Sequence, residues 1–290
     1  MRAGEPEIEE LAEPIGPPLK LADASPLRPM GDRKEADRLR IAEQLISLVA
    51  PDSFAADQYR SLRHTVERVR HEFGLQVLAV TSPAPGDGKT LTTLNLAGAI
   101  AQSPNARVLV IDADLRRPSV SEYLGLGSLR SPGLADAIEN PDIDLPRVVR
   151  SLEGFNLSVL PAGSPRTAPY ELLNSPRLES LLKEARRHYD CVLIDTPPAV
   201  PMPDCRLIER WVDGFFVVVA AHKTPRKLVA ETLNLLDPAK LVGVIFNGDD
   251  RPMSSYYGYY GDYYGGSSHR SDRHVSWWRR IFSRNRPTLR

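Results

Sequence analysis

The sequence predicts an α/β fold with a doubly wound, mostly parallel sheet. Two observations carry this prediction. Short apolar runs, each bounded by turn formers or charges, alternate with helical patterns between residues 41 and 250. Several of these runs are apolar on both faces, as is typical of parallel strands that helices cover on both sides of a sheet.

Each element follows from its own pattern. Strands are expected at 77–80, 108–111, 157–160, 191–194, 215–219 and 242–246, and a shorter apolar run at 45–49 is interpreted as an edge strand. Helices are expected at 54–72, 89–103, 176–187 and 224–236, where apolar residues recur with helical spacing.

Composition limits the possible functions. The 290 residues carry 37 basic and 37 acidic side chains, and this balance argues against a dedicated nucleic-acid binder. No run approaches the ~20 apolar residues that span a bilayer, and the acidic start has no apolar region of a signal peptide. Cys191 and Cys205 lack metal-site spacing, so we expect a reduced, cytoplasmic protein that reaches a membrane through a partner or a surface contact.

The two ends differ in composition from the middle. Residues 1–40 are rich in proline and, at first, in glutamate, a composition that favours a disordered tail. Residues 251–290 hold a tyrosine–glycine cluster followed by a basic run, and they predict a second, flexible tail. One domain, residues 41–250, is expected between them.

A glycine-rich loop follows the first strong strand. Residues 81–90 read TSPAPGDGKT and lead into a helical pattern, the context that a phosphate-binding P-loop requires. Gly86 and Gly88 let backbone amides turn towards phosphate oxygens, Lys89 supplies positive charge, and the Thr90 hydroxyl can ligate Mg²⁺. Pro83 stands where the usual pattern has a glycine.

Two further strands end in carboxylates. The run at 108–111 is followed by Asp112 and Asp114, and the run at 191–194 is followed by Asp195. Ligands of open α/β sheets lie beyond the carboxyl ends of the strands, so these side chains are expected beside the P-loop. A carboxylate at that place can hold Mg²⁺ or its waters.

Three motifs together resemble those of a known family. The stretches TSPAPGDGKT, VLVIDADLRRP and CVLIDTPP look like the Walker A, A′ and B motifs of bacterial tyrosine kinases of the capsular exopolysaccharide type, and the resemblance runs from about residue 45 to 250. It implies a P-loop NTPase fold related to the chromosome-partitioning and septum-positioning ATPases. Those relatives carry a signature lysine where this chain has Ala84, which favours the kinase branch.

The resemblance also implies roles for individual residues, with ATP and Mg²⁺ as cofactors. Lys89 would hold phosphates, Asp112 would lie near the attacking hydroxyl and the metal, and Asp114 would share that metal or base role. Thr90, Asp112 and Asp195 would bind the metal. The residues expected to contact ATP are Pro85, Gly86, Asp87, Gly88, Lys89, Thr90, Leu91 and Asn247, the last at the adenine.

A charged helix face resembles the family's oligomerisation motif. Asp57, Arg60 and Arg63 are spaced by three and so share one face of the helix expected at 54–72. The resemblance implies a homo-oligomer, such as a ring, that meets a neighbouring subunit through these residues. Asp57 stands where the family has a longer glutamate, and a merely solvated charged face is the alternative.

Six tyrosines fall within nine residues near the end of the chain. Interspersed glycines exclude a core strand there, and exposed phenols in a flexible tail can be presented to a neighbour's nucleotide site. A low-complexity aromatic segment is the alternative. The expected phosphoacceptors are Tyr256, Tyr257, Tyr259, Tyr260, Tyr263 and Tyr264.

The basic segment beyond the tyrosines leaves three readings open. Residues 269–290 interleave tryptophans with arginines, which fits an anionic membrane surface, an acidic loop of a partner, or disorder.

The hypothesis that unites these patterns is a Mg·ATP-dependent tyrosine autokinase in exopolysaccharide or capsule synthesis or export. The resemblance implies a separate transmembrane activator of the polysaccharide co-polymerase type, and recruitment to the inner face of the plasma membrane. The alternatives are a P-loop ATPase switch that binds a membrane partner in its ATP state, and a non-enzymatic module in which the tails act.

Overall fold

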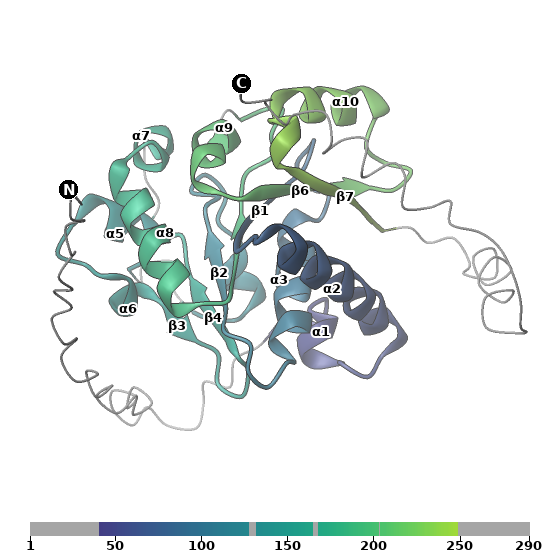
Figure 1. Cartoon of the computed structure of the whole chain (residues 1–290), viewed down its shortest axis with the longest axis horizontal. Coiled ribbons are helices and arrows are strands. Elements are labelled where there is room, and N and C mark those ends of the chain that lie inside the picture. Colours follow the sequence, from purple (N-terminus) through teal and green to yellow (C-terminus); the bar gives the residue numbers. More distant parts are fainter. Residues whose placement is uncertain (1–40, 128–131, 165–167, 203, 249–290) are drawn as a thin grey trace, which may run out of the picture. The chain divides into compact units, whose positions relative to one another are not determined.

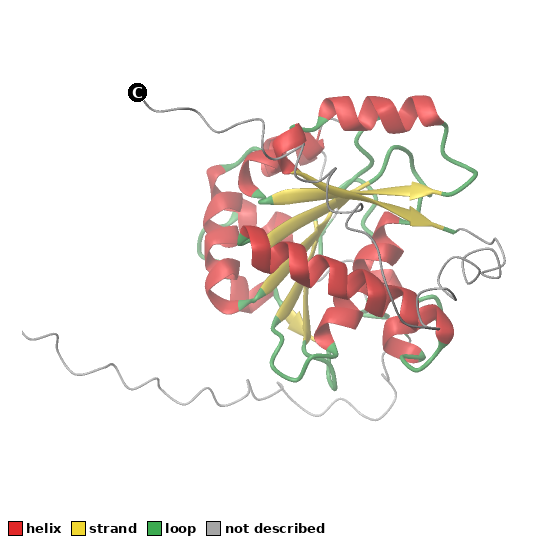
Figure 2. Ribbon diagram, turned by 45° about the vertical axis from the view of Figure 1, so that its right-hand side comes forward, coloured by secondary structure: helices red, strands yellow, loops and turns green. Residues whose placement is uncertain are grey.

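The computed structural model describes residues 41–127, 132–164, 168–202 and 204–248. The tails predicted at 1–40 and 251–290, including every tyrosine of the cluster, lie outside these residues. The described chain forms a seven-stranded sheet in the order β3-β4-β2-β5-β1-β6-β7, which runs through the middle of Figures 1 and 2. All neighbouring strands are parallel except β3, which pairs antiparallel with β4.

The strands are β1 (Val77–Thr81), β2 (Val108–Asp112), β3 (Arg150–Ser151), β4 (Leu157–Leu160), β5 (Cys191–Asp195), β6 (Gly214–Ala220) and β7 (Leu241–Asn247). The α-helices are α1 (Ile46–Val49), α2 (Phe54–Phe73), α3 (Lys89–Ala101), α4 (Val120–Tyr123), α5 (Leu134–Glu139), α6 (Leu145–Val148), α7 (Pro169–Leu173), α8 (Pro176–His188), α9 (Asp204–Ile208) and α10 (Arg226–Leu235). Two 3₁₀ turns, η1 (Glu209–Trp211) and η2 (Pro238–Lys240), complete the described elements.

Helices cover both faces of the sheet and create two cores. Helices α1 to α4 pack on one face, against the side chains of Leu78, Val110 and their neighbours on that side. Helices α5 to α10 pack on the other face, against Val77, Leu109 and their neighbours. Because successive strand residues point to opposite faces, strands that are apolar throughout are required between two helical layers. The predicted doubly wound α/β fold is confirmed.

Most predicted elements are confirmed to within two residues, but the strand predicted at 45–49 is wrong. Those residues form α1 instead, a single helical turn. Leu45 and Leu48 are both buried, three positions apart, which is the spacing of one helical face rather than of a strand. Gly98 of α3 permits the contact, because a Cβ there would lie 2.8 Å from Leu48 Cδ2. The sequence patterns also did not identify β3, which is only two residues long.

The register of the central strands brings the three predicted motifs together. Asp112 at the end of β2 lies opposite Asp195 at the end of β5. Asp195 is in turn aligned with Val80 of β1, next to the start of the phosphate loop. The carboxyl ends of β1, β2 and β5 therefore form one edge at which the candidate residues meet.

At the opposite end of the strands, the Asp213 carboxylate joins the start of β1 to helix α8. Asp213 Oδ2 accepts hydrogen bonds of 2.7 Å from the backbone N–H groups of Gln76 and Val77. Arg186 of α8 forms a two-pronged ion pair with the same carboxylate, at 2.8 and 2.7 Å. Burial alone would raise the pKa of Asp213, but the hydrogen bonds from Arg186 and from the backbone outweigh it and lower the pKa.

We predict that Asp213→Asn destabilises the domain by about 2 kcal/mol at neutral pH, since the variant loses the ion pair with Arg186. A carboxylate with a lowered folded-state pKa stabilises above its unfolded-state pKa, and this contribution is lost as pH falls. The difference between wild type and variant should therefore shrink between about pH 5 and about pH 3. Denaturant unfolding at several pH values measures it. Glu179→Gln, which breaks the exposed pair with Lys183, is the control and should change little. An equal loss in both variants would contradict the prediction.

Candidate active site

The phosphate loop joins β1 to α3 through two glycines in the left-handed region. Gly86 has φ of 82° and Gly88 has φ of 90°, values that L side chains rarely adopt. Gly88 caps α3, which begins at once with Lys89. A Cβ at Gly88 would also collide with the side-chain amide of Asn247. The positive end of α3 and the turned backbone of the loop form a ready anion-binding cradle.

Asp87 fixes the shape of this loop. Its Oδ2 accepts a hydrogen bond of 2.9 Å from the backbone N–H of Ala84. Its Oδ1 accepts one of 2.7 Å from the hydroxyl of Thr224, which lies just after β6. Its backbone carbonyl accepts a third, of 3.0 Å, from Asn247 Nδ2 at the end of β7. Asp87 thus links the loop to two strands beyond it, and neither Thr224 nor this role was identified from the sequence.

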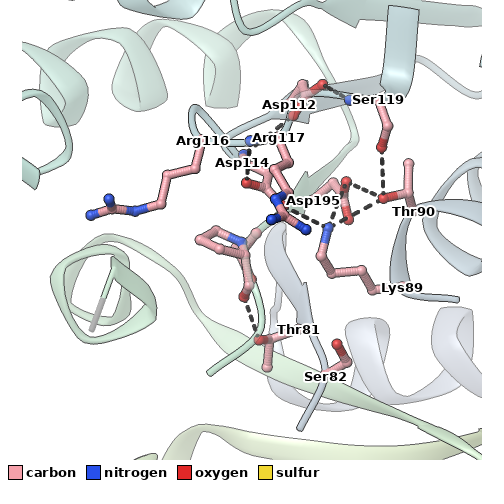
Figure 3. Close-up of polar contacts among 12 residues, drawn as sticks. Thr81, Ser82, Lys89, Thr90, Asp112, Asp114, Arg116, Arg117, Ser119 and Asp195 are labelled. Atoms are coloured by element: carbon pink, nitrogen blue, oxygen red, sulfur yellow. Dashed lines mark hydrogen bonds and ion pairs between the residues drawn. The ribbon is translucent and has the colours of Figure 1, made fainter. Parts of the chain in front are cut away.

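Lys89 lies among the carboxylates that were predicted to surround it (Figure 3). Its Nζ is 3.0 Å from Asp114 Oδ2 and 3.6 Å from Asp195 Oδ2. Thr90 donates its hydroxyl proton to the same Asp195 oxygen at 2.7 Å. Ser119, a residue the motifs did not mark, donates to the Thr90 hydroxyl at 3.2 Å. The side chains at the ends of β1, β2 and β5 therefore form one network of hydrogen bonds and ion pairs.

Asp112 is held mainly by backbone groups. Its Oδ2 accepts hydrogen bonds from the N–H groups of Ser119 and Val120, at 3.2 and 3.1 Å, and its Oδ1 accepts one from Asp114 N at 3.2 Å. The side chain is fully buried. The short helix α4 and the loop before it therefore position this carboxylate beside Asp195.

Burial and mutual repulsion shift the pKa values of this cluster. Burial and the neighbouring Asp195 raise the pKa of Asp112 to about 8. Burial also raises the pKa of Asp195 to about 6, although Lys89 and Thr90 oppose the rise. For Lys89, burial alone would lower the pKa, but Asp195 and Asp114 outweigh it and raise the pKa. Three carboxylates around one ammonium leave an excess of negative charge that a further cation relieves.

The residues suit a Mg²⁺ ion bound together with a nucleotide. Asp195 Oδ1 is buried without a hydrogen-bond partner, a need that a cation or its water would meet. Thr90 and Asp112 add further oxygen donors close by. In the described ranges no three acidic, histidine or cysteine side chains gather into a metal site of their own. Mg²⁺ accepts such a place, because it typically binds one or two carboxylates together with substrate phosphates.

One ion pair braces the loop that carries Asp114. Arg116 Nε lies 2.8 Å from Asp204 Oδ2, at the start of α9. Asp204 is buried, and its pairing with Arg116 compensates the charge. The pair ties the loop after β2 to the segment after β5, and the sequence patterns did not identify it.

The predicted oligomerisation residues have different surroundings. Arg63 is engaged within the chain: it donates to Ala99 O at 2.9 Å and Ser103 Oγ at 2.6 Å, and it pairs with Glu67 at 2.8 Å. Arg60 is more exposed and pairs with Asp57 at 2.9 Å. Arg63 therefore fastens α2 to the end of α3.

Among the described helices none is long and apolar enough to cross a membrane. The predicted phosphoacceptor tyrosines lie outside the described residues.

Comparisons with known proteins identify the family of the chain. Residues 75–204 match the family model described as an AAA domain. A tyrosine-protein kinase of Bacillus subtilis, YwqD, is 33% identical over 77% of this chain and 93% of its own length. The succinoglycan biosynthesis transport protein ExoP of Rhizobium meliloti is 29% identical over 76% of this chain, which spans only 28% of that longer protein.

A solved structure adds the same relationship at the level of the fold. The kinase domain of the Escherichia coli tyrosine kinase ETK superposes with a TM-score of 0.67 at 28% identity, over 83% of this chain and 89% of the other. Because the Bacillus relative is matched over nearly its whole length at more than 30% identity, the chain belongs to the bacterial tyrosine-protein kinases.

Proposed function

We propose that the chain is a Mg·ATP-dependent tyrosine autokinase that phosphorylates its own C-terminal cluster, Tyr256 to Tyr264. The observation that carries the proposal is the convergence of Lys89, Thr90 and Asp195 at the phosphate loop. Membership of the tyrosine-kinase family and six closely spaced phenols in the same chain support it.

The residues of the candidate site have different roles in the proposed phosphoryl transfer. The loop amides and Lys89 would bind the phosphates, and Asn247 is the proposed contact of the adenine. Bound Mg²⁺ would neutralise charge that develops on the phosphate oxygens, with Thr90 and Asp195 as its protein ligands. Asp114 holds the Lys89 ammonium in position at 3.0 Å.

Asp112 is the candidate proton acceptor. As the tyrosine Oη bonds to the terminal phosphorus and the bond to the ADP oxygen breaks, the phenolic proton passes to the Asp112 carboxylate. In its ionised form, which dominates above the raised pKa of about 8, Asp112 is a stronger base than an ordinary carboxylate. Its three backbone hydrogen bonds hold it in place for this step.

The setting proposed for this activity is exopolysaccharide or capsule synthesis or export. The Rhizobium relative, a succinoglycan biosynthesis transport protein, supports it. We propose that a separate transmembrane activator recruits the chain to the inner face of the plasma membrane. The activator's cytosolic segment therefore belongs in any assay of the kinase.

The first prediction from the proposed function concerns the chemistry. Wild type incubated with Mg·ATP and a candidate activator segment should gain phosphotyrosine on a blot. Lys89→Met should lose at least about 100-fold of this signal, because it removes the cation that binds the phosphates. Changing all six tail tyrosines to phenylalanine should abolish the signal while ATP binding persists. ATP turnover without phosphotyrosine would instead favour a P-loop ATPase switch.

The second prediction concerns the buried carboxylates. Acids with raised folded-state pKa values destabilise the fold when they ionise, so the cost appears above about pH 4 and is complete above about pH 8. At pH 8, Asp195→Asn should therefore stabilise the nucleotide-free chain, by on the order of 2 kcal/mol, and should remove the stabilisation by Mg·ATP. Thermal unfolding with and without Mg·ATP measures both effects.

Asp190→Asn is the matched control for this measurement. The hydrogen bond from Arg107 lowers the pKa of Asp190, so its replacement should not stabilise the chain and should preserve the response to Mg·ATP. A variant Asp195→Asn that is still stabilised by Mg·ATP would exclude Asp195 as a metal ligand.

The third prediction separates the two arginines of α2. Arg63→Ala should lower the unfolding temperature by several degrees, because it removes hydrogen bonds that fasten α2 to α3. Arg60→Ala should leave that temperature nearly unchanged and reduce the mass of the homo-oligomer in light scattering. An unchanged mass for Arg60→Ala would exclude this helix face as the subunit contact.

A further inference from the structure

The turn after β6 places a cation at the mouth of the phosphate loop. A methyl group added to Gly86 would lie 4.0 Å from Lys223 Nζ. Among the described residues, and apart from the chain neighbours of Gly86, no other heavy atom lies within that distance. The space over Gly86 is therefore open, and an ammonium borders it.

This turn is fastened to the loop that it faces. Thr224 donates to Asp87 Oδ1 at 2.7 Å and accepts a hydrogen bond from Ala220 N at 3.0 Å. The backbone N–H groups of Lys223 and Thr224 both donate to Ala220 O. His222, just before Lys223, has φ of 59°, a left-handed conformation that tightens the turn. The base of the Lys223 side chain is thus held in register with the phosphate loop.

Lys223 has no anionic partner in the described part of the chain. Its ammonium makes no ion pair or hydrogen bond there. Helix α10 follows with Arg226 and Lys227 and without an acidic residue in its first turn. Cations beside the positive end of a helix repel one another and the helix dipole, so this arrangement favours a bound anion.

The charges around Lys89 point to the same anion. Lys89 is opposed there by Asp112, Asp114 and Asp195, so that wall of the site is negative when all three are ionised. A triphosphate that approaches this wall needs positive charge from another direction. Lys223, an exposed cation whose amine borders the open space over Gly86, can supply it.

We propose that Lys223 binds the polyphosphate of the nucleotide, and that Thr224 positions it through Asp87. This inference rests on the proposed function, since it requires ATP at the phosphate loop. It adds a second cation, from the β6–α10 turn, to the Lys89 that the P-loop motif supplies.

The test is direct binding of Mg·ATP to the full chain, measured by calorimetry. Lys223→Met should weaken binding about tenfold at low salt, the usual effect of losing a charge-assisted hydrogen bond. The difference should fall to about two- to threefold near 0.5 M salt, because an exposed charge is screened. Lys223→Arg should retain most of the affinity, and the control Lys183→Met, on α8, should retain all of it.

A double-mutant cycle tests the positioning role. Thr224→Val should lower the affinity for Mg·ATP, and Thr224→Ser, which keeps the hydroxyl, should retain it. The double variant Thr224→Val/Lys223→Met should bind Mg·ATP as tightly as whichever single variant has the lower affinity. The unfolding temperatures of the nucleotide-free Lys223 variants should equal that of wild type.

The possible outcomes distinguish a failure of this inference from a failure of the proposed function. Failure of wild type to bind Mg·ATP would refute the proposed function and the inference together. Binding by wild type with an affinity that Lys223→Met changes less than twofold would refute the inference alone. A loss that salt does not diminish would also refute it, because Lys223 would then act through the fold and not through its charge.

Discussion

The structure depends on one electrostatic compensation: the Lys89 ammonium, on a side chain that is 12% exposed, faces carboxylates from two other strands. Asp114 and Asp195 lie 3.0 and 3.6 Å from it, and Asp112 adds a third acid from the same edge. Removing charged groups from water is costly, and here one cation is shared among several anions. Positive charge is therefore lacking at this end of the sheet, and a Mg²⁺ ion bound with a nucleotide would supply it.

Asp87 links the phosphate loop to the ends of the neighbouring strands β6 and β7. Its carboxylate and carbonyl together hold Ala84, Thr224 and Asn247, so the loop, the end of β6 and the end of β7 form one hydrogen-bonded unit. The chain leaves β7 towards the tyrosine cluster a few residues later. The hydrogen bond from Asn247 to Asp87 therefore joins the phosphate loop to the end of the strand that precedes the tyrosine cluster in the sequence.

The sequence was sufficient for the features that depend on local pattern. The apolar runs predicted the sheet because strands buried on both faces must be apolar throughout. The loop motif located Lys89 and Thr90 because a P-loop uses these residue types to bind phosphate and Mg²⁺. The sequence misassigned 45–49 because a short, mostly apolar run suits a strand or a helical turn equally. Contacts with residues far along the chain, namely Asn95, Gly98 and Gln102, accompany the helical turn. The sequence patterns did not identify Ser119, Thr224 or Arg116 for another reason. Each of these side chains contacts a residue far away in the chain, and a local sequence pattern does not indicate such a partner.

The same compensation explains why stability and function oppose each other at this edge. A carboxylate such as Asp195 keeps one oxygen unpaired and a raised pKa in the free chain, which are costs to the fold. A bound cation would convert both costs into binding free energy, because the unpaired oxygen would gain a ligand and the repulsion would fall. Residues that merely hold the fold, such as Asp213 with its lowered pKa and four hydrogen bonds, show the opposite pattern. The contrast between Asp195, with its unpaired oxygen, and the half-buried but fully paired Asp213 thus marks Asp195 as a candidate functional residue on physical grounds, independently of any motif.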